Sequence, residues 1–187
     1  MSKVRESREY VIRGPFGVQV LNPKRCWYKL SDDVATSFFR DNSIEHYSSK
    51  IGVYVFARKH GRTYLPIYVG KSVNSFGAEI FNDSNRLTYN DAVMENNGKF
   101  FVFLIIPTDI EGCNNWNVAD RTVSQRRSDE IDNIETFFIQ KAAKANPKLK
   151  NKQKRKTPEW HIAGLVRKKK RGIKESSLSE FKKMMKM

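Results

Sequence analysis

Two tyrosines, Tyr54 and Tyr68, stand in near-mirrored triplets that could carry chemistry, Gly-Val-Tyr at 52–54 and Tyr-Val-Gly at 68–70. Two apolar runs flank a polar loop, which predicts a β-hairpin. If the hairpin is symmetric about Gly61, the two rings face one another with Cβ atoms about 4.5–5.5 Å apart. Gly52 and Gly70 would then be opposed and leave space for a close approach to the backbone. The alternative is an ordinary aromatic pair in a core.

A carboxylate, Glu135, stands on the apolar side of a predicted helix, four residues after Ile131 and three before Phe138. A buried acid needs a cation or hydrogen-bond donors as partners. One interpretation is a salt bridge to an arginine such as Arg86, or a side chain that reaches the helix edge. The other is a metal ligand, for which Mg²⁺ is the natural ion because one carboxylate, waters and a substrate phosphate suffice to hold it.

Taken together, these motifs resemble the GIY-YIG nuclease family. The two triplets supply its paired motifs with Val for Ile, Arg86 its helical arginine, Glu135 its glutamate, and the "NPKLKN" segment at 146–151 its closing turn. The resemblance covers about residues 50–151. It departs from the family in a longer hairpin loop, in a later arginine, and in Asn90 at a position where a basic or aromatic residue is typical.

The resemblance implies an α+β fold with a small three-stranded antiparallel sheet flanked by helices. It also implies a DNA endonuclease that hydrolyses phosphodiester bonds with Mg²⁺ or Mn²⁺. Glu135 would hold the ion, Arg86 would stabilise charge on phosphorus, and Tyr54 would accept a proton from water directly or through Tyr68. A phenol is a poor base at neutral pH, so nearby positive charge must lower its pKa. Further candidates around the phosphate are Lys71, Tyr89, Asn90 and Asn151.

The elements that must position these residues can be predicted from local pattern. A helix capped by Asp83 or Ser84 runs over about 85–96, and the apolar run 99–106 forms a buried strand. A second helix begins at Ser128 or Asp129. The N-terminal section predicts two short strands over 9–22 and a helix capped by Ser31, and a capping box predicts a last helix from Ser177.

Positive charge is concentrated at the C-terminal end of the chain. The net charge is +15, and residues 141–187 hold 17 Lys and Arg against three acids. Such a concentration favours a polyanion, because neutralised phosphates release counterions. A solvated basic tail and an anionic membrane surface are the alternatives. The predicted contacts to double-stranded DNA are Arg58, Lys59, Arg62, Lys152, Lys154, Arg155, Lys156, Arg167, Lys168, Lys169, Lys170 and Arg171.

The 187 residues suggest an N-terminal extension (1–49), a nuclease-like domain (50–151) and a basic C-terminal extension (152–187). Since no apolar run approaches the ~20 residues of a membrane helix and no signal peptide is evident, we expect a soluble, cytoplasmic protein with no membrane partner. Two distant cysteines and three scattered histidines predict no zinc site. Four kinds of function stay open. Two are enzymatic: restriction-type cleavage, for which a homodimer on DNA is one option, and structure-specific repair cleavage. The other two are nucleic-acid binding without cleavage and a purely structural basic protein.

Overall fold

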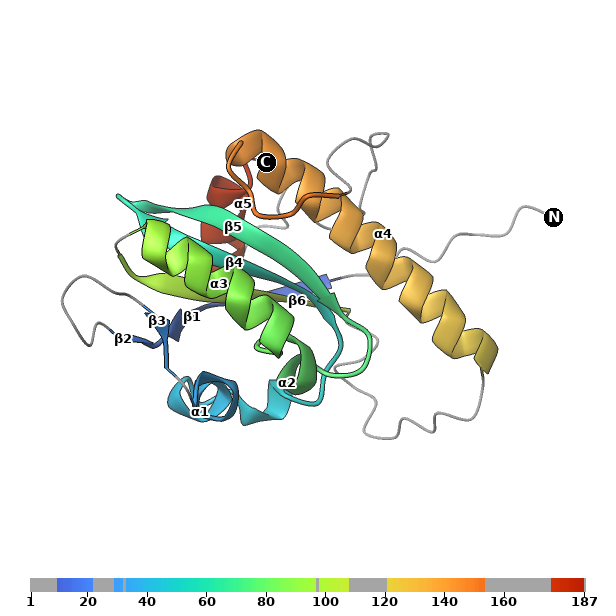
Figure 1. Ribbon diagram of the computed structural model, residues 1–187. Coiled ribbons are helices and arrows are strands. Elements are labelled where there is room, and N and C mark those ends of the chain that lie inside the picture. The colour runs from blue at the N-terminus through green and yellow to red at the C-terminus, as the bar shows by residue number, and fades with distance from the viewer. Residues whose placement is uncertain are drawn as a thin grey trace.

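The computed structural model describes residues 10–21, 29–31, 33–96, 98–107, 121–153 and 176–186 (Figure 1). The basic stretch over 154–175 lies outside these residues, and so do the predicted contacts Lys154, Arg155, Lys156, Arg167, Lys168, Lys169, Lys170 and Arg171.

An antiparallel sheet of four strands forms the centre of the fold. In spatial order these are β1 (Tyr10–Val18), β6 (Phe100–Pro107), β4 (Gly52–His60) and β5 (Thr63–Ser72). The α+β class is confirmed, whereas the predicted three-stranded sheet is wrong. The fourth strand is β1, which pairs with β6 along its length apart from a register shift between Arg13 and Phe16. A pairing between segments about ninety residues apart leaves no local signal in the sequence.

One face of the sheet is covered by three helices: α1 (Val34–Asp41), α2 (Phe76–Glu79) and α3 (Asp83–Glu95). On this face a core forms around the even-numbered side chains of β4 and the buried side of α3. The 3₁₀ helix η1 (Glu45–Tyr47) and a small strand pair, β2 (Val20–Leu21) with β3 (Lys29–Leu30), border the same layer.

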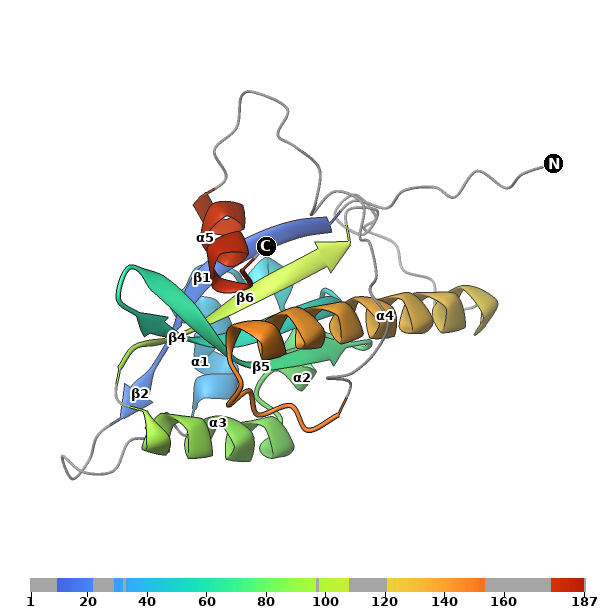
Figure 2. The same cartoon turned by 90° about the horizontal axis from the view of Figure 1, so that it is seen from above.

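The other face is covered by α4 (Arg121–Ala145) and α5 (Ser176–Met184) (Figure 2). Their core contains the odd-numbered side chains of β4 together with apolar residues of both helices. The molecule is therefore a three-layer sandwich with one core on each face of the sheet. Because β1 and α5 belong to these cores, both predicted extensions contribute to the packing of the central part.

Several helix starts differ from the prediction. The N–H of Asn85 donates to the side chain of Asn82, so α3 begins at Asp83, two residues earlier than predicted. The first helix begins after Asp33 and not after Ser31. The long helix α4 begins at Arg121, two turns before the predicted caps Ser128 and Asp129. Over the described residues, no helix combines the length and the apolar character needed to cross a membrane.

Candidate active site

The register of the β4–β5 hairpin places Tyr54 opposite Gly70, and Tyr68 opposite Phe56. The predicted direct pairing of the two tyrosines, and of Gly52 with Gly70, is therefore wrong. Two local features cause the shift. The turn has two central residues, because His60 pairs with Thr63, and a β-bulge adds one residue to β5 next to Pro66. Proline has no N–H for a ladder hydrogen bond, so a bulge is a favourable place for it.

Tyr54 and Tyr68 are nonetheless diagonal neighbours on the same face of the sheet. Their ring centroids lie 6.5 Å apart, with an interplanar angle of 39°. The Tyr54 ring lies over Gly70, where a Cβ atom would come closer than 3.0 Å to the Cζ and Oη atoms of that ring. The glycine of the second triplet is thus required by the tyrosine of the first, which explains why the two triplets occur together.

Tyr54 is the buried member of the pair, with 1% of its surface exposed. Its hydroxyl oxygen accepts a hydrogen bond of 2.8 Å from Nδ2 of Asn85, and the same nitrogen donates to the carbonyl of Glu79 at 2.6 Å. Burial raises the pKa of the Tyr54 phenol well above its ordinary value, and the neighbouring Tyr68 raises it further. The nearby Tyr89 hydroxyl and the hydrogen bond from Asn85 offset only part of this effect. The phenol is therefore neutral at physiological pH.

A third phenol, Tyr89, completes the cluster from α3. Its ring stacks on Phe56 with a centroid separation of 4.1 Å and meets the Tyr68 ring edge-on at 5.7 Å. Its hydroxyl is buried beside that of Tyr54, close enough to couple the two phenols, although within the described part of the chain it has no hydrogen bond of acceptable geometry. Burial raises the pKa of Tyr89 as well.

Tyr68 is the phenol at the mouth of the cluster, because it is only half-buried. Burial is the main cause that raises its pKa, followed by the negative charges of Glu135 and Glu79. Glu135 is 8% exposed on α4, which covers the face of the sheet opposite to Tyr54. Since β5 is an edge strand, the Glu135 carboxylate can act on Tyr68 across this edge. The structure thus brings the two predicted tyrosines together, whereas the predicted glutamate lies on the helix that covers the opposite face and acts on Tyr68 through its charge.

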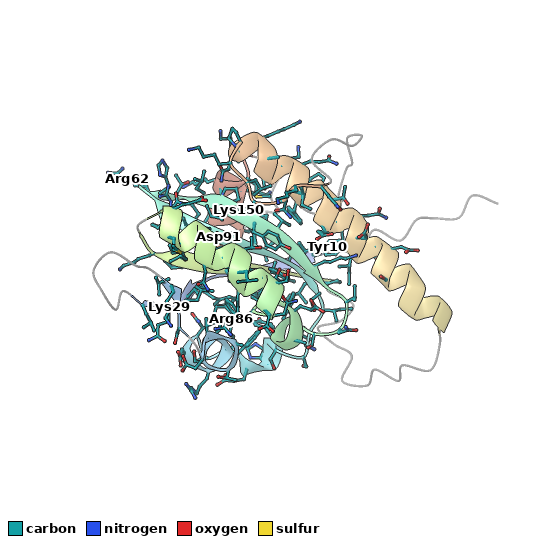
Figure 3. The ribbon with its side chains drawn as sticks, viewed as in Figure 1. Tyr10, Lys29, Arg62, Arg86, Asp91 and Lys150 are labelled. Carbon is teal, nitrogen blue, oxygen red and sulfur yellow. The ribbon has the colours of Figure 1, made fainter. Side chains whose placement is uncertain are left out.

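Arg86 is placed differently from the other predicted catalytic residues. It lies on the side of α3 that faces α1, away from β5 (Figure 3). Asn90, four residues later and hence on the same side of the helix, accepts a hydrogen bond from the backbone N–H of Leu30 in β3. The charged side chains that raise the pKa of Tyr68 are carboxylates. Arg86 therefore lies on the α1 side of α3, whereas the tyrosine pair lies on β4 and β5.

Two more predicted residues form ties between elements. Lys71 Nζ lies 2.6 Å from Oδ1 of Asp132 and links β5 to α4. The Asn151 side chain accepts from the Val69 N–H at 2.8 Å and donates to the Val69 carbonyl at 2.7 Å. Asn151 thus acts as a short substitute for a further strand at the edge of β5.

The described basic residues predicted to contact DNA lie at and near the hairpin. Lys59 Nζ lies 4.1 Å from the centroid of the Tyr64 ring, and Arg62 is exposed at the hairpin tip (Figure 3). Lys152 is exposed just after Asn151. Arg58 points to the α3 side of the sheet and lines a hollow there.

Sequence reasoning missed Glu79 and Asn85. Glu79 ends the short helix α2 and adds a second carboxylate beside the phenols, while Asn85 holds the Tyr54 hydroxyl. A signal was present for Asn85, which precedes Tyr89 by four residues and so shares its side of α3. No such spacing existed for Glu79, whose position depends on the turn between α2 and α3.

The donor set at this site suits a hard divalent cation. Mg²⁺ binds through one or two carboxylates and keeps several waters. Glu135 on α4 and Glu79 on α2 approach from opposite faces of the sheet, and each acts on Tyr68 through its negative charge. Their joint effect on Tyr68 shows a negative potential that a cation would relieve. Among the described residues, no group of three or more His, Cys, Asp or Glu side chains gathers into an all-protein metal cage.

Comparisons with known proteins found no match among models of protein families, among curated proteins or among solved structures.

Proposed function

We propose that this chain is a divalent-metal-dependent DNA endonuclease of the GIY-YIG type. The observation that carries the proposal is the pair of neighbouring rings Tyr54 and Tyr68, with the negative charge of Glu135 acting on Tyr68 from the opposite face of the sheet. An aromatic pair in an ordinary core has no need of two carboxylates beside it, since buried charge is costly.

The roles within the site follow from burial. Tyr68 is the phenol that solvent and a phosphate can reach, and Tyr54 packs behind it with its hydroxyl fixed by Asn85. As a neutral group Tyr68 donates a hydrogen bond to a phosphate oxygen or to water. It can accept a proton only when positive charge offsets Glu135 and Glu79.

Glu135 and Glu79 are the residues that would hold Mg²⁺ or Mn²⁺. When bound, such an ion polarises the scissile phosphate and stabilises the leaving oxygen. The role of Arg86 in stabilising charge on phosphorus is proposed from the resemblance in sequence alone, because its position in the structure does not support that role.

Plasmid cleavage tests the proposal. The full chain should nick or linearise plasmid with Mg²⁺ or Mn²⁺, and EDTA should stop this. Glu135→Ala should abolish cleavage while DNA binding persists. Glu130→Gln is the matched control, because Glu130 lies on the same helix but contacts Tyr10 of β1, and it should retain cleavage.

A second candidate is a nucleic-acid-binding protein that shares this fold without cleaving. Two observations favour this candidate. The raised pKa values of the phenols oppose formation of a phenolate base, and Arg86 lies on the α1 side of α3, away from β5. Tight, salt-sensitive binding with unchanged plasmid at every divalent ion tested would select it. If cleavage occurs, mapping the cut sites on a sequenced plasmid separates site-specific from structure-specific enzymes, and cleavage of both strands at a palindrome would indicate a dimer or sequential nicking.

A further inference from the structure

A basic hollow of about 420 Å³ lies next to the tyrosine site on the same side of the sheet. Three cationic residues and one acid contribute to its wall, and the complete lining is Arg58, Leu65, Ile67, Glu95, Asn96, Asn146, Lys148 and Lys150. The side chains of this lining have a net charge of +2, from three cations and one carboxylate. An anion is therefore the ligand that the hollow suits electrostatically.

The cations of the hollow are held in place by backbone hydrogen bonds. After α4, the Lys150 N–H donates to the Ile67 carbonyl at 2.8 Å, and Asn146 Nδ2 donates to the Pro66 carbonyl at 2.7 Å. The buried Leu149 anchors this segment between them. Lys150 Nζ also meets Oε1 of Glu95 on α3 at 2.6 Å. The lysines that follow α4 are thus fixed opposite α3 without any ligand.

Arg58 supplies a donor that no described residue uses. Its Nε atom is fully buried and makes no hydrogen bond to any described residue. The guanidinium of Arg58 belongs to the wall of the hollow, while its Nε atom lies beneath that wall. A guanidinium presents donors in a planar fork that matches the oxygen atoms of a phosphate group.

We propose that this hollow binds a phosphate group, and that the group belongs to the DNA strand whose neighbouring phosphodiester lies at Tyr68. This inference rests on the proposed function for its choice of DNA. Arg58 pairs with Leu65, three residues before Tyr68, which is a distance of about 10 Å along a strand. At about 3.4 Å of helix rise per nucleotide, that distance spans only a few nucleotides. The carboxylates near Tyr68 thus suit a metal ion at the cleavage point, and the cations of the hollow suit a backbone phosphate nearby on the same strand.

The salt dependence of duplex binding tests the proposal, measured with the full chain in EDTA so that cleavage does not interfere. Each lost phosphate contact should reduce the slope of log K against log salt by about one and weaken binding roughly uniformly across sequences. Because the hollow holds one phosphate, we expect a reduction of at most about one for either Arg58→Gln or Lys148→Gln/Lys150→Gln. The matched control is Lys182→Gln/Lys183→Gln, which removes the same charge from α5 on the opposite face and should leave the slope nearly unchanged. Equal slopes for the hollow pair and the control pair would overturn the proposal.

The Nε–Hε NMR signal of Arg58 separates the two sources of phosphate. A short duplex should shift this signal at constant ionic strength. A shift with inorganic phosphate but none with the duplex would assign the hollow to a free phosphate ion and overturn the DNA assignment, and no shift with either would overturn the phosphate site altogether.

Cleavage by the same variants keeps the two proposals apart. A chain that binds DNA through the hollow but never cuts contradicts the nuclease alone. A chain that cuts normally while the hollow variants keep the wild-type slope contradicts the hollow alone.

Discussion

At the scale of single residues, the site is defined by phenols that are kept neutral and by carboxylates that increase this effect. Tyr54 and Tyr89 are buried on the α3 side, and Tyr68 lies at the mouth under the influence of Glu135 and Glu79. Such an arrangement is unfavourable for a phenolate and favourable for a bound cation. The carboxylates that oppose proton loss from Tyr68 therefore also attract a cation, and the positive charge of that cation would favour the proton loss.

The packing of Tyr54 on Gly70 predicts that Gly70→Ala destabilises the fold. The new methyl group would lie within 3.0 Å of the Tyr54 ring, and overpacking of this kind typically costs about 1–3 kcal/mol. Urea unfolding measures the change. Gly17→Ala in β1 is the control, because the nearest atom to a Cβ there is 4.0 Å away, and it should change the free energy of unfolding by less than about 0.5 kcal/mol. Equal stability of the two variants would contradict the packing described here.

The charge on Glu135 predicts a change in the titration of Tyr68. Glu135→Gln removes one of the negative charges that raise the pKa of Tyr68, so this pKa should fall toward its ordinary value. The ¹³Cζ NMR signal of Tyr68 measures it, and Glu130→Gln should leave it unchanged. Adding Mg²⁺ to the wild-type chain should act in the same direction, which reports metal binding without any cleavage.

The same titration has a consequence for stability. Because the folded-state pKa of Tyr68 lies above the unfolded value of about 10, neutral Tyr68 contributes stability that is complete below that pH. The contribution disappears as the pH rises through the folded-state pKa. Glu135→Gln should shift this alkaline loss to lower pH, and an unchanged profile would mean that the carboxylate does not act on Tyr68.

At the scale of elements, β5 is the strand at whose edge the two helical layers of the molecule approach one another. It is an edge strand, so side chains from α3 on one face and from α4 on the other can approach the same point. The segment after α4 then covers part of the exposed edge with hydrogen bonds to Pro66, Ile67 and Val69. Covering an edge in this way also protects it from pairing with other chains.

The Asn151 tie predicts that Asn151→Ala loosens this edge. The substitution removes two hydrogen bonds to Val69 and leaves the buried N–H of Val69 unpaired. We expect the free energy of unfolding to fall by about 1–3 kcal/mol. Urea unfolding gives the cost, and amide hydrogen exchange at Val69 should become faster. Lys152→Ala, one residue further along and exposed, should change neither quantity. Unchanged exchange at Val69 in Asn151→Ala would show that this side chain does not secure the edge.

Local pattern was sufficient to predict β4, β5, β6 and the helix that carries Glu135, because their apolar runs and spacings are strong. The register between the tyrosines could not be predicted, since it depends on a bulge beside Pro66 and on the length of the turn. The fourth strand escaped prediction because β1 pairs with β6 over a long sequence separation. Glu79 and the hollow at Arg58 arise only from the packing of α2, α3 and the segment after α4.

At the scale of the whole molecule, segments that the sequence assigns to extensions complete the two cores. Ile12 of β1 and Phe181 of α5 belong to the same core as α4. On the α3 side, Val18 of β1 and Phe38 of α1 belong to the second core. The sheet that carries the tyrosines is therefore supported by residues from both ends of the described chain.

This arrangement predicts that Phe181→Ala is strongly destabilising although Phe181 lies far from the nuclease-like motifs in sequence. The ring is fully buried and meets Phe138 of α4 at 5.2 Å and Phe103 of β6 at 5.7 Å. Truncation of a buried phenylalanine leaves a cavity and costs about 3–5 kcal/mol. Denaturant unfolding of the full chain measures this cost. Lys183→Ala, exposed on the same helix, should cost less than about 0.5 kcal/mol. If Phe181→Ala were as mild as Lys183→Ala, α5 would not be part of the core, and the sheet would be stable without the C-terminal extension.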